Sequence, residues 1–319
     1  MISFIYKDRS RFRTGGAVTA GIKFRDALLE KKIPLNVLSY TFGNSNILGI
    51  IKDSLINRNI VIWNLSTKSL KFFFIIIIFQ TLIKKNIIIR FFGSNQKSLY
   101  KDKLFYRFIF QFLMKAKIIL TFETLDNYNF FKKINKDVYH LPNFIKIKSY
   151  KNFKKKYSKK FVYVGNILQN KGIELILKFL LENPSFSCDF YGYNKDYKVD
   201  KKYKTIWKKS YKGILSREEI LKIYRNYDFT LLPSSKEGYP SVILESMCQN
   251  TPLVLSSLPS LMEMIQNSAI FFGTNYESFK KIMLEINDKA LNKLSVNIKK
   301  DLIKYDQDKI IEKFIRDIL

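Results

Sequence analysis

The stretch EGYPSVILESMCQNTPLVL, residues 237–255, decides the fold of this chain of 319 residues. An apolar run at residues 229–232 (FTLL), ended by Pro233, predicts a buried strand just before it. The stretch itself predicts a turn, a helix that stops at Asn250, and a second apolar strand at residues 253–255. Strand, turn, helix and strand indicate a parallel sheet, and the turn then lies at its carboxyl edge, where α/β proteins bind ligands.

A Gly-Tyr-Pro-Ser turn lies between two carboxylates, Glu237 and Glu245. Pro240 suits the first turn of a helix because the N–H group that proline lacks has no acceptor there. The first backbone N–H groups of the helix, those of Ser241 and Val242, favour an anion such as a diphosphate. A helix start flanked by two acids suits a ligand with phosphates in the middle and hydroxyls at both ends, which describes a sugar nucleotide.

These residues resemble the Glu-x7-Glu signature of retaining, GT-B-fold glycosyltransferases of family 4. The context adds to the resemblance: Leu-Pro-Ser before the signature, then Glu-Gly-Tyr-Pro, Leu-Glu and Asn-Thr-Pro-Leu-Val. In that family the first Glu contacts hydroxyls of the donor sugar and the second holds the ribose, which implies these roles for Glu237 and Glu245. The bare spacing of the two acids also fits a chance pair on a solvated helix.

The resemblance implies an α/β chain with the GT-B fold: two Rossmann-like domains with parallel sheets that face each other across a cleft, and a C-terminal helix that returns to the first domain. We expect residues 1–150, completed by a helix at 305–319, to form an N-terminal acceptor- and membrane-facing domain. Residues 151–304 are expected to bind the nucleotide-sugar donor. A Lys-rich stretch, residues 146–160, is the expected linker.

A strand, turn and helix are also predicted at residues 163–180, YVGNILQNKGIELILKFL. Lys171 lies at the expected sheet edge and is a point cation suited to offsetting charge on a departing phosphate. The family has Gly-Arg followed by Lys-Gly in this place, whereas this chain has Gly165 and then Asn166, so the first cation is absent. Either Lys171 and helix N–H groups hold the leaving group, or another cation such as Lys236 substitutes.

The resemblance thus implies a site with two parts. The catalytic residues are Glu237 and Lys171. The donor-binding residues are Glu245, Gly238, Tyr239, Pro240, Ser241, Val242, Gly165 and Asn166.

A Gly-Gly pair, Gly15 and Gly16, follows the first predicted strand and begins a helix. Glycines allow a backbone to approach a ligand closely, and the start of a helix favours anions. The family has a Gly-Gly loop here that faces the donor phosphates and the acceptor, and the resemblance implies this role. An ordinary turn is the alternative.

The chain has one histidine, His140, in a sequence similar to the family's turn before the linker, and we expect it to shape that turn. Where family members often have a His that contacts the sugar, this chain has Phe92; Asn95, Thr121 and Glu123 are alternative contacts. A single histidine excludes a His-rich metal site and disfavours a Ser-His-Asp triad. The resemblance implies neither a metal ion nor a cofactor.

The net charge is +29, from 56 basic and 27 acidic residues. Residues 1–150 carry 26 basic and 8 acidic residues (net +18), and residues 151–319 carry 30 and 19 (net +11). Such a charge predicts attraction to polyanions, which include anionic membranes and nucleic acids. Compositional drift is the alternative, since Lys, Ile, Asn and Phe are all abundant.

Two apolar segments of the first half bear on membrane contact. Residues 72–83, FFFIIIIFQTLI, are too few for a membrane span, which needs about 20 residues, and predict a buried helix. Residues 99–117 predict an amphipathic helix with Phe110 among Lys103 and Arg107 on its outer side, as a membrane-surface helix requires. A soluble helix whose Phe is tucked against a neighbour fits equally well.

Two cysteines in apolar segments, and a short apolar start that meets Lys7 and Arg9 at once, favour a cytoplasmic location. We therefore expect a metal-independent hexosyl-type glycosyltransferase on the inner face of the cytoplasmic membrane. It would transfer a sugar with retention from a nucleoside-diphosphate sugar to a glycan or lipid-linked acceptor, in the synthesis of a cell-surface polysaccharide such as lipopolysaccharide or capsule. No nucleic acid is an expected partner in this interpretation.

The alternative is a catalytically inactive, transferase-like protein that binds nucleic acid or acts as a scaffold. Asn166, the missing histidine and the charge favour it. A phosphorylase with the same fold is a third alternative, although no cofactor-lysine motif supports it.

Overall fold

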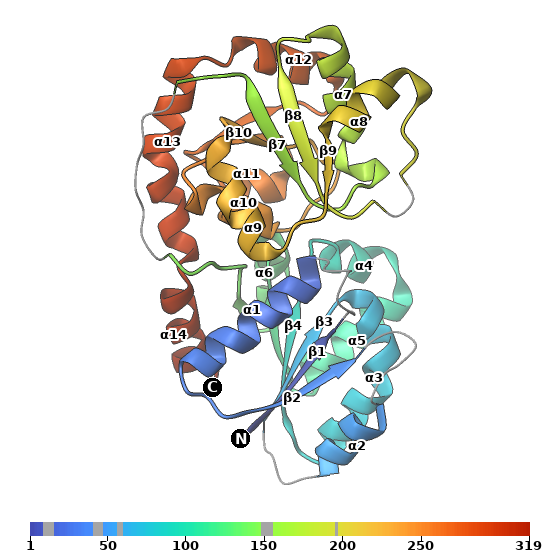
Figure 1. Ribbon diagram of the computed structural model, residues 1–319. Coiled ribbons are helices and arrows are strands. Elements are labelled where there is room, and N and C mark those ends of the chain that lie inside the picture. Colours follow the sequence, from blue (N-terminus) through green and yellow to red (C-terminus); the bar gives the residue numbers. More distant parts are fainter. Residues whose placement is uncertain (9–15, 41–46, 56–59, 148–155, 195–196) are drawn as a thin grey trace. The chain divides into compact units, whose positions relative to one another are not determined.

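The computed structural model describes residues 1–8, 16–40, 47–55, 60–147, 156–194 and 197–319 (Figure 1). The chain divides into two compact units. The first comprises Met1–Asn143 and Gln307–Leu319, and the second comprises Phe144–Asp306. Each unit contains a parallel sheet of six strands.

In the first unit the strands follow the order β2-β1-β3-β4-β5-β6. They are β1 (Ile2–Lys7), β2 (Leu35–Tyr40), β3 (Ile60–Leu65), β4 (Asn86–Phe91), β5 (Ile119–Phe122) and β6 (Val138–His140). The helices are α1 (Gly16–Glu30), α2 (Ile47–Leu55), α3 (Thr67–Leu82), α4 (Gln96–Asp102), α5 (Leu104–Lys115), α6 (Leu125–Lys132) and α14 (Gln307–Ile318). Continuous apolar runs such as those of β3 and β4 are typical of strands that are covered on both faces.

The C-terminal helix α14 packs on α1 of the first unit. The rings of Phe24 and Phe314 meet edge to face with centroids 5.0 Å apart. Lys31 at the end of α1 pairs with Glu312 at 2.7 Å and with Asp308 at 2.9 Å. The chain therefore returns to its first unit, as the resemblance implied.

In the second unit the strand order is β12-β11-β10-β7-β8-β9. The strands are β7 (Lys160–Val164), β8 (Ser187–Tyr191), β9 (Tyr211–Gly213), β10 (Phe229–Leu232), β11 (Leu253–Ser256) and β12 (Ala269–Phe272). The helices are α7 (Ile173–Glu182), α8 (Lys204–Ser210), α9 (Arg217–Ile223), α10 (Ser241–Cys248), α11 (Pro259–Met264), α12 (Tyr276–Glu285) and α13 (Asp288–Leu302).

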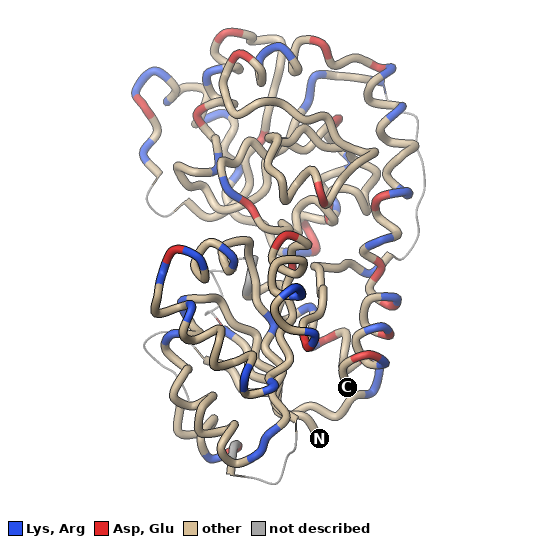
Figure 2. Tube along the Cα trace, turned by 180° about the vertical axis from the view of Figure 1, so that it is seen from behind, with Lys and Arg blue, Asp and Glu red and all other residues tan. Residues whose placement is uncertain are grey.

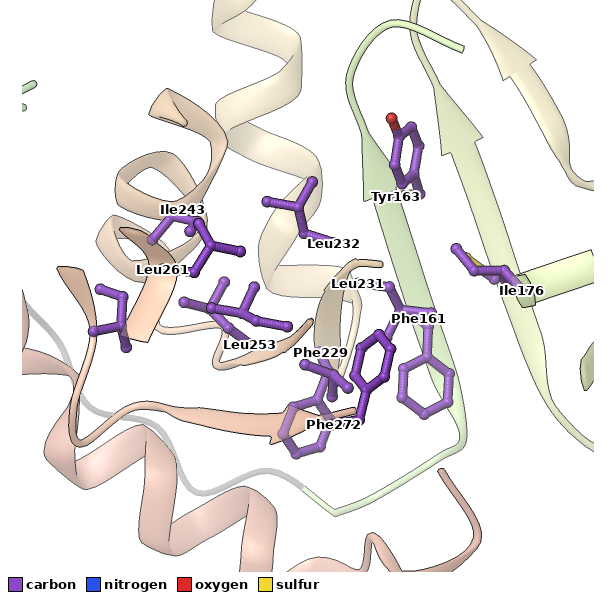
Figure 3. Close-up of a cluster of buried hydrophobic side chains, with 14 of the residues drawn as sticks. Phe161, Tyr163, Ile176, Phe229, Leu231, Leu232, Ile243, Leu253, Leu261 and Phe272 are labelled. Atoms are coloured by element: carbon purple, nitrogen blue, oxygen red, sulfur yellow. The ribbon is translucent and has the colours of Figure 1, made fainter. Parts of the chain in front are cut away.

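The strand order of the second unit reverses between β7 and β10. From β7 the chain proceeds outward through β8 to β9, and from β10 it proceeds outward on the other side to β12. In the buried core of this sheet, Phe161 of β7 and Phe229 of β10 are register partners with ring centroids 6.2 Å apart (Figure 3). Since ligands of open parallel sheets bind beyond the carboxyl ends of the strands where the order reverses, the loops after β7 and β10 are the expected binding loops.

The residue types of segment 205–211, TIWKKSY, predict a strand, and this prediction is wrong. Residues 205–211 are mostly helical: α8 extends from Lys204 to Ser210, and only Tyr211 belongs to a strand. Thr, Ile, Trp and Tyr have a high strand propensity, but propensity yields to packing. Here Trp207 stacks on Tyr211, four residues later, with ring centroids 4.7 Å apart, a contact that helical spacing allows.

The helix predicted at 99–117 is two helices, since Lys103 adopts an extended conformation (φ −128°, ψ 109°) between α4 and α5. Phe110 is fully buried, which corrects the expectation that it faces outward. Its ring lies 4.8 Å from that of Phe131 and 5.3 Å from that of Phe91, so the aromatic core of the sheet holds it.

The expected burial of residues 72–83 is also only partly right. Phe73 and Ile77 of α3 are buried, but Phe72 and Ile75 are exposed. Within the described residues, every helix is too short or too polar to cross a bilayer.

Candidate functional site

An ion pair joins the two loops that follow β7 and β10. Nζ of Lys171 lies 2.5 Å from Oε1 of Glu237. The two side chains are 20% and 8% exposed, so the pair is largely shielded from water but still partly accessible. The residues that the sequence assigned to catalysis are therefore in direct contact at the switch point of the sheet.

Gly172 lets the loop after β7 approach the loop after β10. It adopts a left-handed conformation (φ 69°, ψ 24°) between the turn Gln169–Lys171 and α7. A Cβ atom in its place would lie 2.1 Å from the carbonyl oxygen of Pro233. Only glycine fits here, because both the backbone angle and the space exclude a side chain.

Hydrogen bonds to the carbonyl of Asn170 hold the same two loops together. Ser235 donates to it from its backbone N–H (3.0 Å) and from its hydroxyl (3.2 Å). The distance between Lys171 and Glu237 is thus set by the backbone as well as by their own charges.

Polar neighbours also position Glu237 and Tyr239. The Ser260 hydroxyl donates to the Glu237 carbonyl at 2.9 Å, and the Tyr239 hydroxyl donates to the Glu263 carboxylate. Burial raises the pKa of Tyr163, and the nearby charge of Glu237 raises it further. Tyr163 is therefore a neutral phenol whose hydroxyl donates to the carbonyl of Asn166 at 2.9 Å.

The helix α10 begins at Ser241, and Pro240 precedes it in an extended conformation (φ −69°, ψ 128°). Pro240 is the residue before the helix rather than part of its first turn, which corrects the sequence prediction by one position. The N–H groups of Ser241 and Val242 precede the first intrahelical hydrogen bond, so they point out of the helix start. Gly238 lies in the turn that leads to it.

Two hydroxyl groups in this region are buried and lack a hydrogen-bond partner among the described residues: those of Ser234 and Ser241. Ser234 is 1% exposed and directly follows Pro233, where Gly172 makes its close approach. Sequence reasoning did not single out Ser234, although it lies in the Leu-Pro-Ser segment.

Glu245 lies one helical turn after Ser241 in α10, on the same face of the helix. It is 6% exposed, and its charge adds to the effect of burial in raising the pKa of Tyr224. A buried carboxylate on the face that continues from the helix start is placed to accept hydrogen bonds from a ligand held there.

The ends of β7 and β8 approach each other closely beside this site. A Cβ atom on Gly192 would lie 1.9 Å from the carbonyl oxygen of Gly165, and the Gly165 N–H donates to the Tyr191 carbonyl at 2.9 Å. Asn166 follows directly, with a neutral side chain where the family has a cation. Lys236, the other candidate cation, has an exposed side chain.

The residues proposed from the first unit belong to different elements, and one of them is not described. Gly15 lies outside the described residues, and Gly16 is the first residue of α1. Glu123 accepts a hydrogen bond from the Gly93 N–H at 2.8 Å, Asn95 donates to Thr67 Oγ1 at 3.4 Å, and Thr121 is fully buried. These contacts are structural, and the choice among the three alternatives stays open.

Sequence reasoning did not identify Arg90, which is 1% exposed. Its guanidinium donates to the Ala20 carbonyl at 3.1 Å and lies over the rings of Phe24 (4.7 Å) and Phe92 (4.8 Å). Burial lowers its pKa to about 10, so it remains charged at neutral pH. The available signal was a charged residue within an otherwise apolar strand, NIIIRF.

His140 is held by the carbonyl of Glu123, which lies 3.1 Å from its Nε2. Burial lowers the pKa of His140, the hydrogen bond with the Glu123 carbonyl opposes this, and the nearby charge of Lys313 adds to the lowering, so that the pKa is about 4. The folded state therefore favours the neutral ring, whereas an unfolded chain protonates it near pH 6.5.

We expect the free energy of unfolding to fall as the pH is lowered from about 6.5 to about 4, because the unfolded state then binds the extra proton. Urea unfolding of the parent protein and of His140→Gln at about pH 7.5 and about pH 5.5, on either side of the ordinary histidine pKa, checks this. The loss between the two pH values should be smaller in the variant; equal losses would contradict a buried neutral histidine.

The family model described as "Glycosyl transferases group 1" matches residues 144–305, about half of the chain and nearly all of the second unit. The chain belongs to this glycosyltransferase family. The matched region contains the Lys171–Glu237 pair, Gly172 and α10.

Two curated relatives match parts of this chain. An uncharacterized glycosyltransferase of Methanocaldococcus jannaschii is 29% identical over 120 residues, which cover 34% of this chain and 30% of the relative. The N,N'-diacetylbacillosaminyl-diphospho-undecaprenol alpha-1,3-N-acetylgalactosaminyltransferase of Campylobacter jejuni is 28% identical over 106 residues, 32% of this chain and 28% of the relative. The matches thus span less than a third of either relative.

Solved structures agree along almost the whole chain. HepE of Anabaena, in complex with UDP and glucose, aligns with a TM-score of 0.71 and 13% identity, covering 99% of this chain and 98% of that one. Sucrose-phosphate synthase of Thermosynechococcus elongatus aligns with a TM-score of 0.74 and 10% identity, with the same coverage. At these identities the likeness shows the fold, which is GT-B.

Proposed function

We propose that this glycosyltransferase transfers a hexose-type sugar from a nucleoside-diphosphate sugar, with retention at the anomeric carbon, to a glycan or lipid-linked acceptor. The observation that carries the proposal is the Lys171–Glu237 pair at the switch point of the second sheet. Two comparisons support it: the HepE structure contains UDP and glucose, and the name of the Campylobacter relative describes transfer onto a diphospho-undecaprenol-linked sugar. A role in cell-surface polysaccharide synthesis on the cytoplasmic face of the membrane follows from such an acceptor.

Binding of the donor would replace the ion pair between Lys171 and Glu237 with contacts from each residue to the donor. In the structure Lys171 and Glu237 hold each other in place at 2.5 Å. A diphosphate that binds at this place would compete for the ammonium group of Lys171. Glu237 would then be available to accept hydrogen bonds from hydroxyls of the sugar, which fixes the ring for reaction.

Cleavage of the bond between the anomeric carbon and the diphosphate oxygen builds positive charge on the sugar and negative charge on the leaving group. Lys171 would stabilise the leaving group, together with the N–H groups of Ser241 and Val242. The buried hydroxyls of Ser234 and Ser241 are further donors at this place. Front-face attack by the acceptor, with no protein nucleophile, metal ion or cofactor, follows the family that the sequence resembles.

Glu245 would hold the ribose through hydrogen bonds to its hydroxyls. We expect Glu245→Gln to weaken the binding of nucleoside diphosphates by about 10- to 100-fold, because hydrogen bonds to a charged group contribute about 1.5–3 kcal/mol. Isothermal titration calorimetry with UDP, GDP and ADP measures the affinity. Glu218→Gln, an exposed position on α9, is the matched control. Equal affinities of variant and parent for all three nucleotides would remove the ribose role.

A second function calls for a test because Asn166 replaces a cation and the net charge is +29. An inactive, scaffold-like protein would bind RNA or DNA with an affinity that falls steeply with salt, and would turn over no sugar nucleotide. The first experiment is a thermal-shift screen against nucleoside diphosphates. Stabilisation by one of them, followed by donor turnover, supports the transferase; nucleic-acid binding without either supports the alternative.

A further inference from the structure

Besides Leu82 at the end of α3, which is 74% exposed, five large apolar side chains are exposed on two helices of the first unit. On α3 these are Phe72 (52% exposed) and Ile75 (79%). On α5 they are Leu104 (78%), Phe105 (48%) and Phe108 (60%). We call these five residues the α3–α5 face.

Ring contacts show that the two helices are neighbours. Phe74 of α3 lies edge to face with Phe108 and Phe112 of α5, with centroids 6.4 Å and 5.4 Å apart. The ammonium group of Lys71 lies 5.3 Å from the centre of the Phe105 ring. The exposed residues of both helices therefore form one surface.

The outward side of α3 has large apolar residues beside its two exposed lysines, Lys68 and Lys71. Leu70, Phe73 and Ile77 are buried, whereas Phe72 and Ile75 face outward with Leu82, which is 74% exposed. A helix that covers a sheet in water normally has a polar outer face. A contiguous exposed apolar surface indicates a contact with another apolar phase.

The segment of the chain that carries this surface is strongly basic. From Ser66 to Lys117 the sequence has 11 Lys and Arg residues and a single acidic residue, Asp102; one of the 11, Arg90, is buried. Lys68 and Lys71 are exposed on α3, and Lys103 immediately precedes α5. Along the trace of the first unit in Figure 2, blue Lys and Arg positions outnumber red Asp and Glu positions. Long basic side chains can lie along apolar groups while their charged ends reach outward to anions.

We propose that the α3–α5 face docks on an anionic lipid bilayer. Its aromatic and aliphatic groups enter the boundary between headgroups and acyl chains, and Lys68, Lys71 and Lys103 contact lipid phosphates. The surrounding cations favour this occupant over a second copy of the chain, which would bring the same positive charge. The inference rests on the proposed function only in that a lipid-linked acceptor would be found at such a surface.

Co-sedimentation with sucrose-loaded vesicles tests the proposal. The protein is mixed with vesicles of phosphatidylcholine alone or with about a third phosphatidylglycerol, and the bound fraction is measured against lipid concentration. We expect binding to the anionic vesicles that weakens about tenfold or more in Leu104→Ser/Phe105→Ser/Phe108→Ser, and also in Lys68→Gln/Lys71→Gln/Lys103→Gln.

The matched control removes exposed apolar residues of the second unit, in Leu181→Ser/Leu284→Ser/Val296→Ser, and should bind as the parent does. Circular dichroism and nucleotide binding of each variant show that its fold is intact. Unchanged vesicle binding in both α3–α5 variants would overturn the proposal. A second pair of results would also overturn it: the parent protein does not bind vesicles, and analytical ultracentrifugation shows a parent dimer that the apolar variant does not form. The surface would then be covered by a second copy of the chain.

This experiment is separate from the test of catalysis. Vesicle binding without sugar transfer would overturn the proposed function and leave the docking surface intact. Sugar transfer to a soluble acceptor without vesicle binding would overturn the docking surface and leave the proposed function intact.

Discussion

We expect Lys171→Ala to lower the turnover number by about 100- to 1,000-fold, the effect of removing one group that stabilises charge in a transition state. In the structure Lys171 is the cation in contact with Glu237, and both lie where the strand order of the second sheet reverses. The developing charge on the diphosphate would lose its counter-ion. Steady-state kinetics with the donor that the thermal-shift screen identifies measures both the turnover number and KM.

The substitution also leaves the carboxylate of Glu237, which is 8% exposed, without its ammonium partner. Urea unfolding of the same variant therefore has to accompany the kinetics, so that lost activity is not confused with lost structure. Lys171→Arg keeps the charge but changes the shape of the donor group, and should retain part of the activity.

Substitutions of two further lysines serve as comparisons. Lys208→Ala, at an exposed position on α8, should behave as the parent. Lys236→Ala separates the two ways of holding the leaving group: a large loss there, with near-normal turnover in Lys171→Ala, would assign the phosphate to Lys236 and contradict our assignment.

The second large effect is on stability. Gly172→Ala should lower the free energy of unfolding by about 2–5 kcal/mol, because a left-handed residue with a side chain costs about 1–2 kcal/mol and a forced overlap adds about 1–3 kcal/mol. The overlap is with the carbonyl oxygen of Pro233, which would lie 2.1 Å from a Cβ atom on residue 172. That oxygen belongs to the backbone of the neighbouring strand end, so it cannot turn aside.

Gly213→Ala is the matched control for Gly172→Ala. Gly213 also has a positive φ (83°), but a Cβ atom there would meet nothing within 4 Å. The control should lose only the conformational part, about 1–2 kcal/mol. Equal losses in the two variants, measured by urea unfolding, would mean that the loop after β7 moves away from Pro233 at little cost.

The sequence was most informative where local pattern and local structure coincide. The strand at Phe229–Leu232 has the predicted bounds, because a short apolar run that is ended by a proline leaves little choice of conformation. The placement of Lys171 and Glu237 at one sheet edge also followed from the order of strand, loop and helix, whereas their direct contact was not predicted. Their chemical roles stay predictions.

The failures occurred where distant residues decide the structure. Phe110 is buried because Phe91 and Phe131 from other elements surround it, and the periodicity of its own helix does not contain that information. The bond from Ser235 to the Asn170 carbonyl joins residues 65 positions apart, and a loop sequence does not reveal such a partner. Arg90 was missed for the same reason, since its neighbours Ala20 and Phe24 lie on α1.

The return of α14 to α1 has a consequence for how the protein is made. Phe24, near the start of the chain, packs against Phe314, near its end, and residues 144–306 form a separate unit between them. From residue 143 to residue 314 a ribosome adds 171 residues, which takes roughly 10–30 s at about 5–20 residues per second. During that time the nascent first unit exposes the apolar surface around Phe24 that α14 covers in the finished protein. A chaperone that shields this surface would raise the yield of folded protein.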